Sequence, residues 1–86
     1  MDKRILKLRQ EIDKLDENII LLLKKRMKIS KEVGQLKEEL RLPVEDKTRE
    51  QEIIDRLIQQ AGRNLSEEQL MRIFTAVFTS SKQIQS

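Results

Sequence analysis

The chain has 86 residues, of which 38% are charged, 37% are hydrophobic and 2% are aromatic, with two glycines and one proline. This length allows one small core, and a composition rich in Leu, Ile, Lys and Glu but poor in turn formers predicts helices and argues against sheets. The chain contains no cysteine and no histidine, which excludes disulfides, thiol nucleophiles, His-containing zinc sites and the side chain used most often for proton transfer near neutral pH.

The net charge of +3 arises from 18 basic and 15 acidic residues. So small an excess, with both signs interspersed, argues against nucleic acid as a partner but is compatible with small anions. The N-terminus leads directly into a charged periodic segment, and no apolar run approaches the roughly 18 residues of a membrane span. We therefore expect no signal peptide, no membrane contact and a cytoplasmic location.

Apolar side chains recur at alternating spacings of three and four over residues 5–40, which predicts one long helix with a coiled-coil-like seam. Gly34 lies inside this segment and weakens the helix by about 1 kcal/mol relative to Ala, too little to break it. Pro43 is expected to end the helix. The seam consists of Ile5, Leu8, Ile12, Leu15, Ile19, Leu22, Arg26, Ile29, Val33, Leu36 and Leu40.

Two shorter helices are predicted after the loop of residues 41–46. Asp46 is placed to cap a short second helix, whose apolar stripe covers residues 53–61 and which Gly62 ends. Residues 66–69 (Ser-Glu-Glu-Gln) form a capping box that opens a third helix of medium length. The inner face of the third helix is expected to carry Leu70, Ile73, Phe74, Val77, Phe78, Ser81 and Ile84.

The long helix exceeds what the rest of the chain can cover. A helix of 40 residues extends about 60 Å, whereas a compact chain of this size has a radius of gyration near ~12 Å. A second chain must bury part of the seam, most simply in a two-fold dimer. We therefore predict an all-α fold with one long, one short and one medium helix per chain, in an intertwined homodimeric bundle that forms a single domain over residues 1–86.

Several charged and polar side chains occupy positions near the apolar faces. Arg26 is the one seam position that is not Ile, Leu or Val, and a buried guanidinium needs a partner. Each such residue alone has a plainer explanation, as a register-setting or snorkelling arginine, a solvated flank charge, a helix-dipole partner, a small packing residue or a frayed end. Together they describe a cationic pocket. The set comprises Arg9, Arg26 and Lys37 on the long helix, Arg49 and Glu50 on the second, and Ser81 and Gln85 on the third.

The spacing along the long helix limits which cations can share a ligand. Arg26 and Lys37 are about 16 Å apart in helix rise, and Arg9 is a further ~25 Å from Arg26. One small ligand could bridge the first pair but not all three in one chain. If two long helices pair antiparallel about a midpoint near Leu22, the partner's Arg9 lies beside Lys37. Two or three cations around a dry pocket favour a ligand with two carboxylates.

At these residues the sequence resembles the all-helical chorismate mutase family along essentially all 86 residues. The matching segments are Leu8-Arg9, Ile12-Asp13-x-Leu15-Asp16, Arg26 after the Leu-rich run, residues 33–37, Pro43-Val44, Asp46-x-x-Arg49-Glu50, and Ser81 with Gln85. The resemblance implies an intertwined homodimer with two identical sites, which converts chorismate to prephenate in phenylalanine and tyrosine biosynthesis. This unimolecular rearrangement needs no nucleophile, proton transfer, metal or cofactor, which fits a chain without His or Cys.

The resemblance also implies the role of each site residue. The partner's Arg9 and Arg26 would bind the substrate carboxylates, with Ser81 and Arg49 in support. The remaining four residues would hold the reacting end and the ring. Lys37 and Gln85 would donate to the ether oxygen, while Asp46, mostly through its backbone, and Glu50 would hold the ring hydroxyl.

Two other functions remain open. One is an isochorismate-pyruvate lyase of the same fold, which shares the arginines and the lysine; Glu50 argues against it, because lyase-like relatives tend to have an apolar residue there. The other is a non-enzymatic helical dimerisation module. Such a module has no need for Arg26 on the seam, Ser81 on an apolar face and Glu50 turned inward at once.

Overall fold

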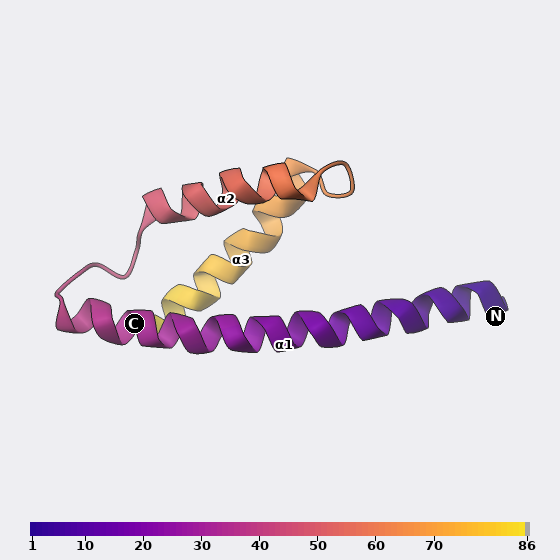
Figure 1. Cartoon of the computed structure of the whole chain (residues 1–86), viewed down its shortest axis with the longest axis horizontal. Helices are drawn as coiled ribbons and strands as arrows, with labels where there is room; N and C mark the ends of the chain where they lie inside the picture. Colours follow the sequence, from indigo (N-terminus) through magenta and orange to yellow (C-terminus); the bar gives the residue numbers. More distant parts are fainter. Residues whose placement is uncertain (86) are drawn as a thin grey trace.

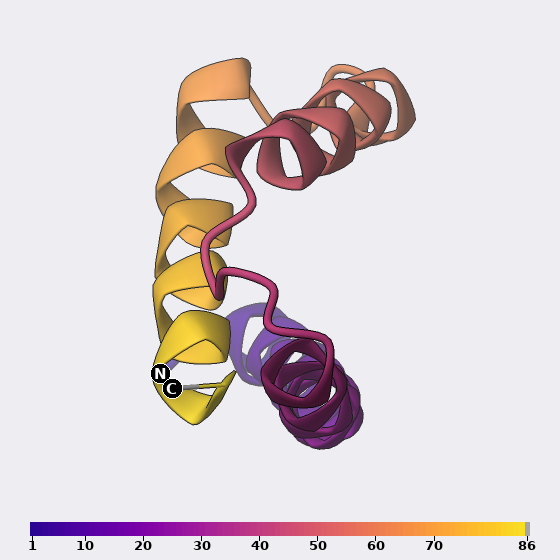
Figure 2. The ribbon, with the colours of Figure 1, turned by 90° about the vertical axis from the view of Figure 1, so that its left-hand side faces the viewer.

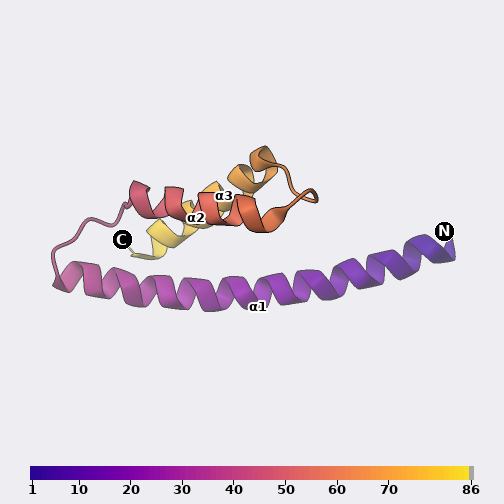
Figure 3. The same cartoon turned by 45° about the horizontal axis from the view of Figure 1, so that its top comes forward.

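The computed structural model describes residues 1–85 and contains three helices, α1 (Lys3–Glu39), α2 (Lys47–Ala61) and α3 (Glu67–Gln85), with no strand among the described residues (Figure 1). The predicted all-helical fold with one long, one short and one medium helix is confirmed. Figure 2 shows that α3 connects the other two helices, with α2 beside its N-terminal end and α1 beside its C-terminal end. Figure 3 shows α2 lying above α1. Packing contacts join α3 to α1 and to α2.

The length of α1 sets the shape of the chain. The molecule extends 56 Å along its longest axis, with a radius of gyration of 16.4 Å, compared with ~12 Å for a compact chain of this size. Only the half of α1 nearer its C-terminus lies beside α3, and the other half projects away from the remaining helices (Figure 1). No helix among residues 1–85 is long and apolar enough to cross a membrane.

The end of α1 differs from the prediction. The helix ends at Glu39, four residues before Pro43, so the expectation that the proline terminates it is wrong. Arg41 has a φ of 57°, and its N–H donates to the Glu38 carbonyl at 3.2 Å while the N–H of Leu42 donates to the Lys37 carbonyl at 2.8 Å. This bond pattern is a Schellman motif, which satisfies two of the last carbonyls and reverses the chain before the proline is reached.

The predicted caps of the other helices are confirmed. The Asp46 carboxylate accepts a hydrogen bond from the Arg49 N–H at 3.0 Å at the start of α2, and Gly62 ends that helix with a φ of 63°, a conformation that glycine adopts without steric penalty. At the start of α3, Ser66 and Gln69 exchange side-chain-to-backbone bonds of 2.9 and 3.1 Å. These reciprocal bonds are the capping box.

The core of the single chain is small and lies mainly between α2 and α3. The Phe74 and Phe78 rings meet edge to face, with 5.9 Å between their centroids. Two positions of the predicted inner face of α3 are not covered within the single chain, where Ile73 is 50% exposed and Ile84 is 40% exposed. The buried apolar side chains are Ile53, Ile54, Leu70 and Phe78.

The seam of α1 is not covered within the chain. Its ten apolar side chains keep between 38% and 67% of their surface exposed. The two buried residues of α1 are Ser30 and Gly34, both in the C-terminal half of the helix, which is the half that lies next to α3 (Figure 1). Monomeric proteins rarely expose an apolar stripe of this length.

Candidate active site

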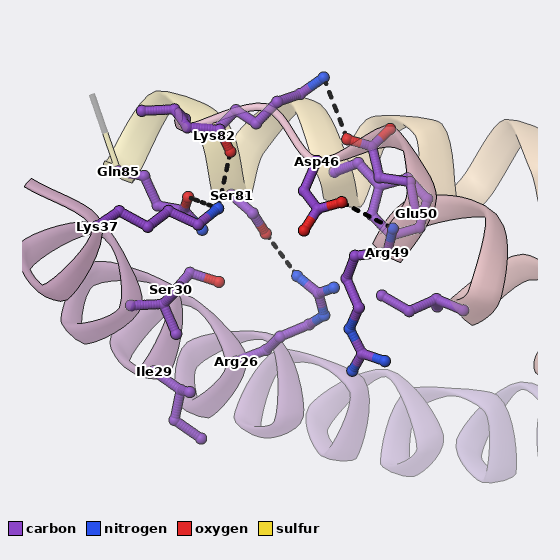
Figure 4. A pocket seen from close by; sticks show the side chains of 14 residues that line it. Arg26, Ile29, Ser30, Lys37, Asp46, Arg49, Glu50, Ser81, Lys82 and Gln85 are labelled. Atoms are coloured by element: carbon purple, nitrogen blue, oxygen red, sulfur yellow. Dashed lines mark hydrogen bonds and ion pairs between the residues drawn. The ribbon is translucent and has the colours of Figure 1, made fainter. Parts of the chain in front are cut away.

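A cavity of about 390 Å³ lies where the C-terminal half of α1, the loop before α2, the start of α2 and the end of α3 meet (Figure 4). The apolar part of its wall includes Ile29, Val33 and Phe78. The structure brings seven of the eight residues singled out in the sequence to this cavity. They are Arg26, Lys37, Asp46, Arg49, Glu50, Ser81 and Gln85.

Arg26 is held at one side of the cavity by α3. Its Nη1 donates to the Ser81 hydroxyl at 2.5 Å, and its guanidinium lies 5.9 Å from the centre of the Phe78 ring. Burial lowers the pKa of the Arg26 guanidinium, and the nearby charge of Arg49 adds to this effect; an arginine nevertheless stays charged at any ordinary pH. No carboxylate among residues 1–85 forms an ion pair with Arg26. Its charge is therefore available to an anionic ligand.

Lys37 and Gln85 form a pair of donors at another part of the cavity. The Lys37 ammonium donates to the Val44 carbonyl at 2.8 Å and to Oε1 of Gln85 at 3.1 Å. Because the amide oxygen of Gln85 accepts from Lys37, its amide nitrogen is left as a donor, and the ammonium keeps a third N–H. One donor from each side chain is thus free for a ligand (Figure 4).

Glu50 is held by a lysine that the sequence analysis missed. The Lys82 ammonium lies 3.4 Å from Oε2 of Glu50 and 3.3 Å from Oε1 of Glu45. Burial opposes the charge of Lys82, but its hydrogen bond to Glu45 and the attraction of Glu50 outweigh this and raise its pKa. Because Lys82 directly follows Ser81, the sequence could have identified it as a site residue. Its ion-pair partners lie on other elements, and helix periodicity cannot predict such contacts.

Ser30 is a second cavity residue that the sequence analysis missed. It is 7% exposed and lies one helical turn after Arg26, on the side that lines the cavity (Figure 4). A polar residue four positions after a candidate ligand-binding arginine falls on the same helix face, and that spacing could have identified it.

Arg9 does not line this chain's cavity. Its Nη1 instead contacts the Met1 sulfur at 3.1 Å, in the exposed N-terminal half of α1. Seventeen residues of helix separate it from Arg26, a rise of about 25 Å. The single chain therefore supplies Arg26 and Lys37 to one cavity but leaves Arg9 outside it. No cluster of three acidic side chains within residues 1–85 is arranged to hold a metal ion.

The fold is that of an all-helical mutase. The chain matches the chorismate mutase type II family over residues 8–86 and belongs to that family, which confirms the resemblance. It is 28% identical over 86 residues to the chorismate mutase of Methanocaldococcus jannaschii, a match that covers 99% of this chain and 87% of that protein. It is also 41% identical over 51 residues to the bifunctional chorismate mutase/prephenate dehydratase of Aquifex aeolicus, which is 59% of this chain but 14% of that longer protein.

Solved structures show the same fold. A chorismate mutase from Helicobacter pylori in complex with prephenate is 38% identical and superposes with a TM-score of 0.89, covering 98% of this chain and 91% of that one. A conserved hypothetical protein from Pyrococcus furiosus is 37% identical, with a TM-score of 0.84 over the full length of both chains.

Proposed function

We propose that this chain is a chorismate mutase, which converts chorismate to prephenate on the route to phenylalanine and tyrosine. In this 3,3 (Claisen) rearrangement the ether C–O bond breaks and a C–C bond forms within one molecule, so no cofactor is required. The observation that carries the proposal is the cavity itself. An unpaired, part-buried Arg26 lies on one side and the Lys37–Gln85 donor pair lies on another.

The cationic side of the cavity suits the carboxylates of the substrate. Arg26 is positioned by Ser81 and has a second guanidinium, that of Arg49, close enough to affect its pKa. A planar guanidinium binds a carboxylate through two parallel hydrogen bonds, which fixes orientation as well as position. Fixing the enolpyruvyl group over the ring removes much of the entropic part of the barrier.

The donor pair suits the ether oxygen, on which negative charge develops as the C–O bond breaks. Lys37 and Gln85 orient one another, so their free donors need no reorganisation during the reaction. By analogy with oxyanion holes, each donor contributes about 2.7 to 4 kcal/mol to transition-state stabilisation. Two such donors, together with conformational restriction, account for a ~10⁶-fold acceleration, which corresponds to about 8 kcal/mol.

Glu50 and Asp46 hold the ring hydroxyl in this proposal. The Glu50 carboxylate is oriented by Lys82 at 3.4 Å and can accept a hydrogen bond from an alcohol. Asp46 acts mostly through its backbone, as the resemblance implies, while its carboxylate accepts from the Arg49 N–H as the cap of α2.

The proposal includes a homodimer of single-domain chains. Arg26, Ile29 and Val33 belong both to the seam and to the lining of the cavity. A second copy packed antiparallel along the seam would therefore also form part of the cavity wall. Pairing about a midpoint near Leu22 brings the partner's Arg9 to the side of the cavity at Lys37. The partner's Arg9 then supplies a further cation for the substrate carboxylates.

The loss of chorismate absorbance on addition of the purified protein tests this function. We expect saturable turnover that needs no added metal or cofactor and that falls at least about 100-fold in Lys37→Ala, which lacks one ether-oxygen donor. A parallel assay with isochorismate tests the lyase alternative, against which the carboxylate of Glu50 in the cavity argues. A folded protein without turnover of chorismate would disprove the proposal.

A further inference from the structure

Gly34 lies on the buried face of α1 where the last residue of α3 reaches it. A Cβ atom at position 34 would lie 2.7 Å from Cα of Gln85, 2.9 Å from its Cβ and 3.0 Å from its Cγ. The nearest of these atoms belongs to the backbone of α3, so a change of the Gln85 rotamer cannot relieve the contact. A side chain of any size at position 34 therefore requires the end of α3 to move.

Backbone conformation does not explain the glycine. Gly62 is the one glycine with a positive φ among residues 1–85, and Gly34 is in the interior of a regular helix. Glycine destabilises a helix interior relative to alanine, because it loses more freedom on folding. The close approach of Gln85 is the feature of this position that only glycine permits.

Gly34 and Lys37 lie three residues apart and so share one face of α1. The turn of α1 that contacts the backbone of α3 is therefore the same turn that carries the Lys37 ammonium. In this arrangement Lys37 Nζ and Gln85 Oε1 are 3.1 Å apart, and both side chains line the cavity (Figure 4). To reach ordinary contact with a Cβ at position 34, the Gln85 Cα would have to retreat from 2.7 Å to at least 3.4 Å.

We propose that Gly34 is a positioning residue for catalysis. Because it has no side chain, the end of α3 packs directly against α1, and this close packing orients the Gln85 amide toward the reacting oxygen. This inference rests on the proposed mutase function. Gly34 does not touch the substrate and acts through Gln85. A displacement near 1 Å at a catalytic group lowers the rate by about 100-fold, so a methyl group here has a large expected effect.

A double-mutant cycle on kcat tests the proposal with Gly34→Ala, Gln85→Ala and the double variant. We expect Gly34→Ala to lower kcat about 10- to 100-fold, with KM changed less than about threefold and a melting temperature within about 5 °C of the parent protein. In the Gln85→Ala background, where the donor is already lost, Gly34→Ala should lower kcat less than about threefold further. A merely structural role would instead give the same loss in both backgrounds, and either that result or an unchanged kcat would overturn the proposal.

Stability provides a test that needs no substrate. Gln85→Gly removes two of the three atoms that a Cβ at position 34 would meet, and it allows the last turn of α3 to unwind. If Gly34→Ala melts early or does not fold, the addition of Gln85→Gly should recover at least half of the lost melting temperature. If the melting temperature did not recover, the contact between position 34 and Gln85 would not be the cause of the loss, and the proposal would be overturned. This melting comparison can be made even if the unmodified chain fails to consume chorismate, an outcome that would disprove the proposed function but not the contact between position 34 and Gln85.

Discussion

The two halves of α1 share one apolar pattern but have different surroundings. Between Leu23 and Lys37 the helix lies against α3, buries Ser30 and Gly34 and supplies the cavity with three of its polar residues. Every residue from 1 to 22 is exposed, although the seam continues through that region without a break. The comparison teaches that an apolar pattern predicts which face of a helix is suited to burial, but does not show whether the same chain covers that face.

Breaking the N-terminal half of the seam should have the largest effect. In a monomer, Leu15→Glu would change stability by less than about 0.5 kcal/mol, because Leu15 is 59% exposed in its own chain. In the proposed dimer it buries an unpaired carboxylate, so we expect dissociation and a loss of activity of about 100-fold or more at micromolar concentration.

Light scattering and turnover together check this prediction. Gln10→Glu is the matched control, since it adds the same charge to an exposed position about 200° around the helix from the seam residue Leu8. A Leu15→Glu protein that keeps its activity and mass would show that the seam has no partner.

The next prediction assigns Arg9 to the second chain. Arg9→Ala and Arg26→Ala should each be nearly inactive, because each removes a carboxylate ligand. When the two variants are refolded together, random pairing gives heterodimers with one intact and one doubly defective site, so about a quarter of the parent activity should return. Steady-state rates of the mixture provide the measurement, and a mixture as inactive as its components would place Arg9 in the site of its own chain.

The pH dependence distinguishes the donor role of Gln85. No shifted group near the cavity changes charge between about pH 5.5 and 8.5, so kcat/KM of the parent should be nearly constant there. Arg26 stays charged despite its lowered pKa. The pKa of Lys82 is raised above 10.5, so its pairs with Glu45 and Glu50 are complete below that pH and are lost only as the pH rises through the higher, folded-state value.

In Gln85→Glu the donor exists only while the new carboxyl is protonated, near or below about pH 4.3 for an unperturbed glutamate. Burial would raise that pKa, and the adjacent Lys37 ammonium would lower it. Activity should therefore fall as the pH rises, with a loss of about 100-fold at pH 7. Rate profiles of both proteins over this range test the role, and a variant that matches the parent in rate and pH independence would exclude Gln85 as a donor.

The smallest expected effect comes from removing the ion pair between Lys82 and Glu50. Lys82→Met releases the carboxylate of Glu50 without altering any proposed ligand of the substrate. Because the two ion pairs of Lys82 are partly solvated, we expect a loss in kcat/KM of about 3- to 10-fold. Lys82→Arg keeps the charge and serves as the control. Equal losses in both variants would show that the charge is not what holds Glu50.

The sequence predicted the features that depend on local rules. The caps at Asp46, Gly62 and Ser66 follow from residue types at fixed offsets, and so do the lengths of the helices. The end of α1 was mispredicted, because a left-handed Arg41 carries no sequence signal comparable to that of a glycine or a proline. Local rules also predict helix faces, but they do not show whether the chain itself covers a face, as the exposed Ile73 demonstrates.

The candidate site was recovered to the extent that its residues interrupt an apolar face. Arg26 and Ser81 are such interruptions, and the structure brings them within 2.5 Å of each other. Lys82 and Ser30 do not interrupt a seam, so only their positions relative to Ser81 and Arg26, and not the apolar pattern, could have identified them. Gly34 was interpreted only as a local weakness of the helix, since its importance depends on a contact with Gln85, fifty-one positions away in the sequence.

The small core of the single chain affects how this protein folds and associates. Four apolar side chains are buried among the described residues, whereas the apolar side chains of the seam stay exposed and add little to the stability of an isolated chain. If a second copy covers the seam, then folding and association are a single bimolecular event. The melting temperature then rises with protein concentration, and the amount of folded enzyme in a dilute solution is set by mass action.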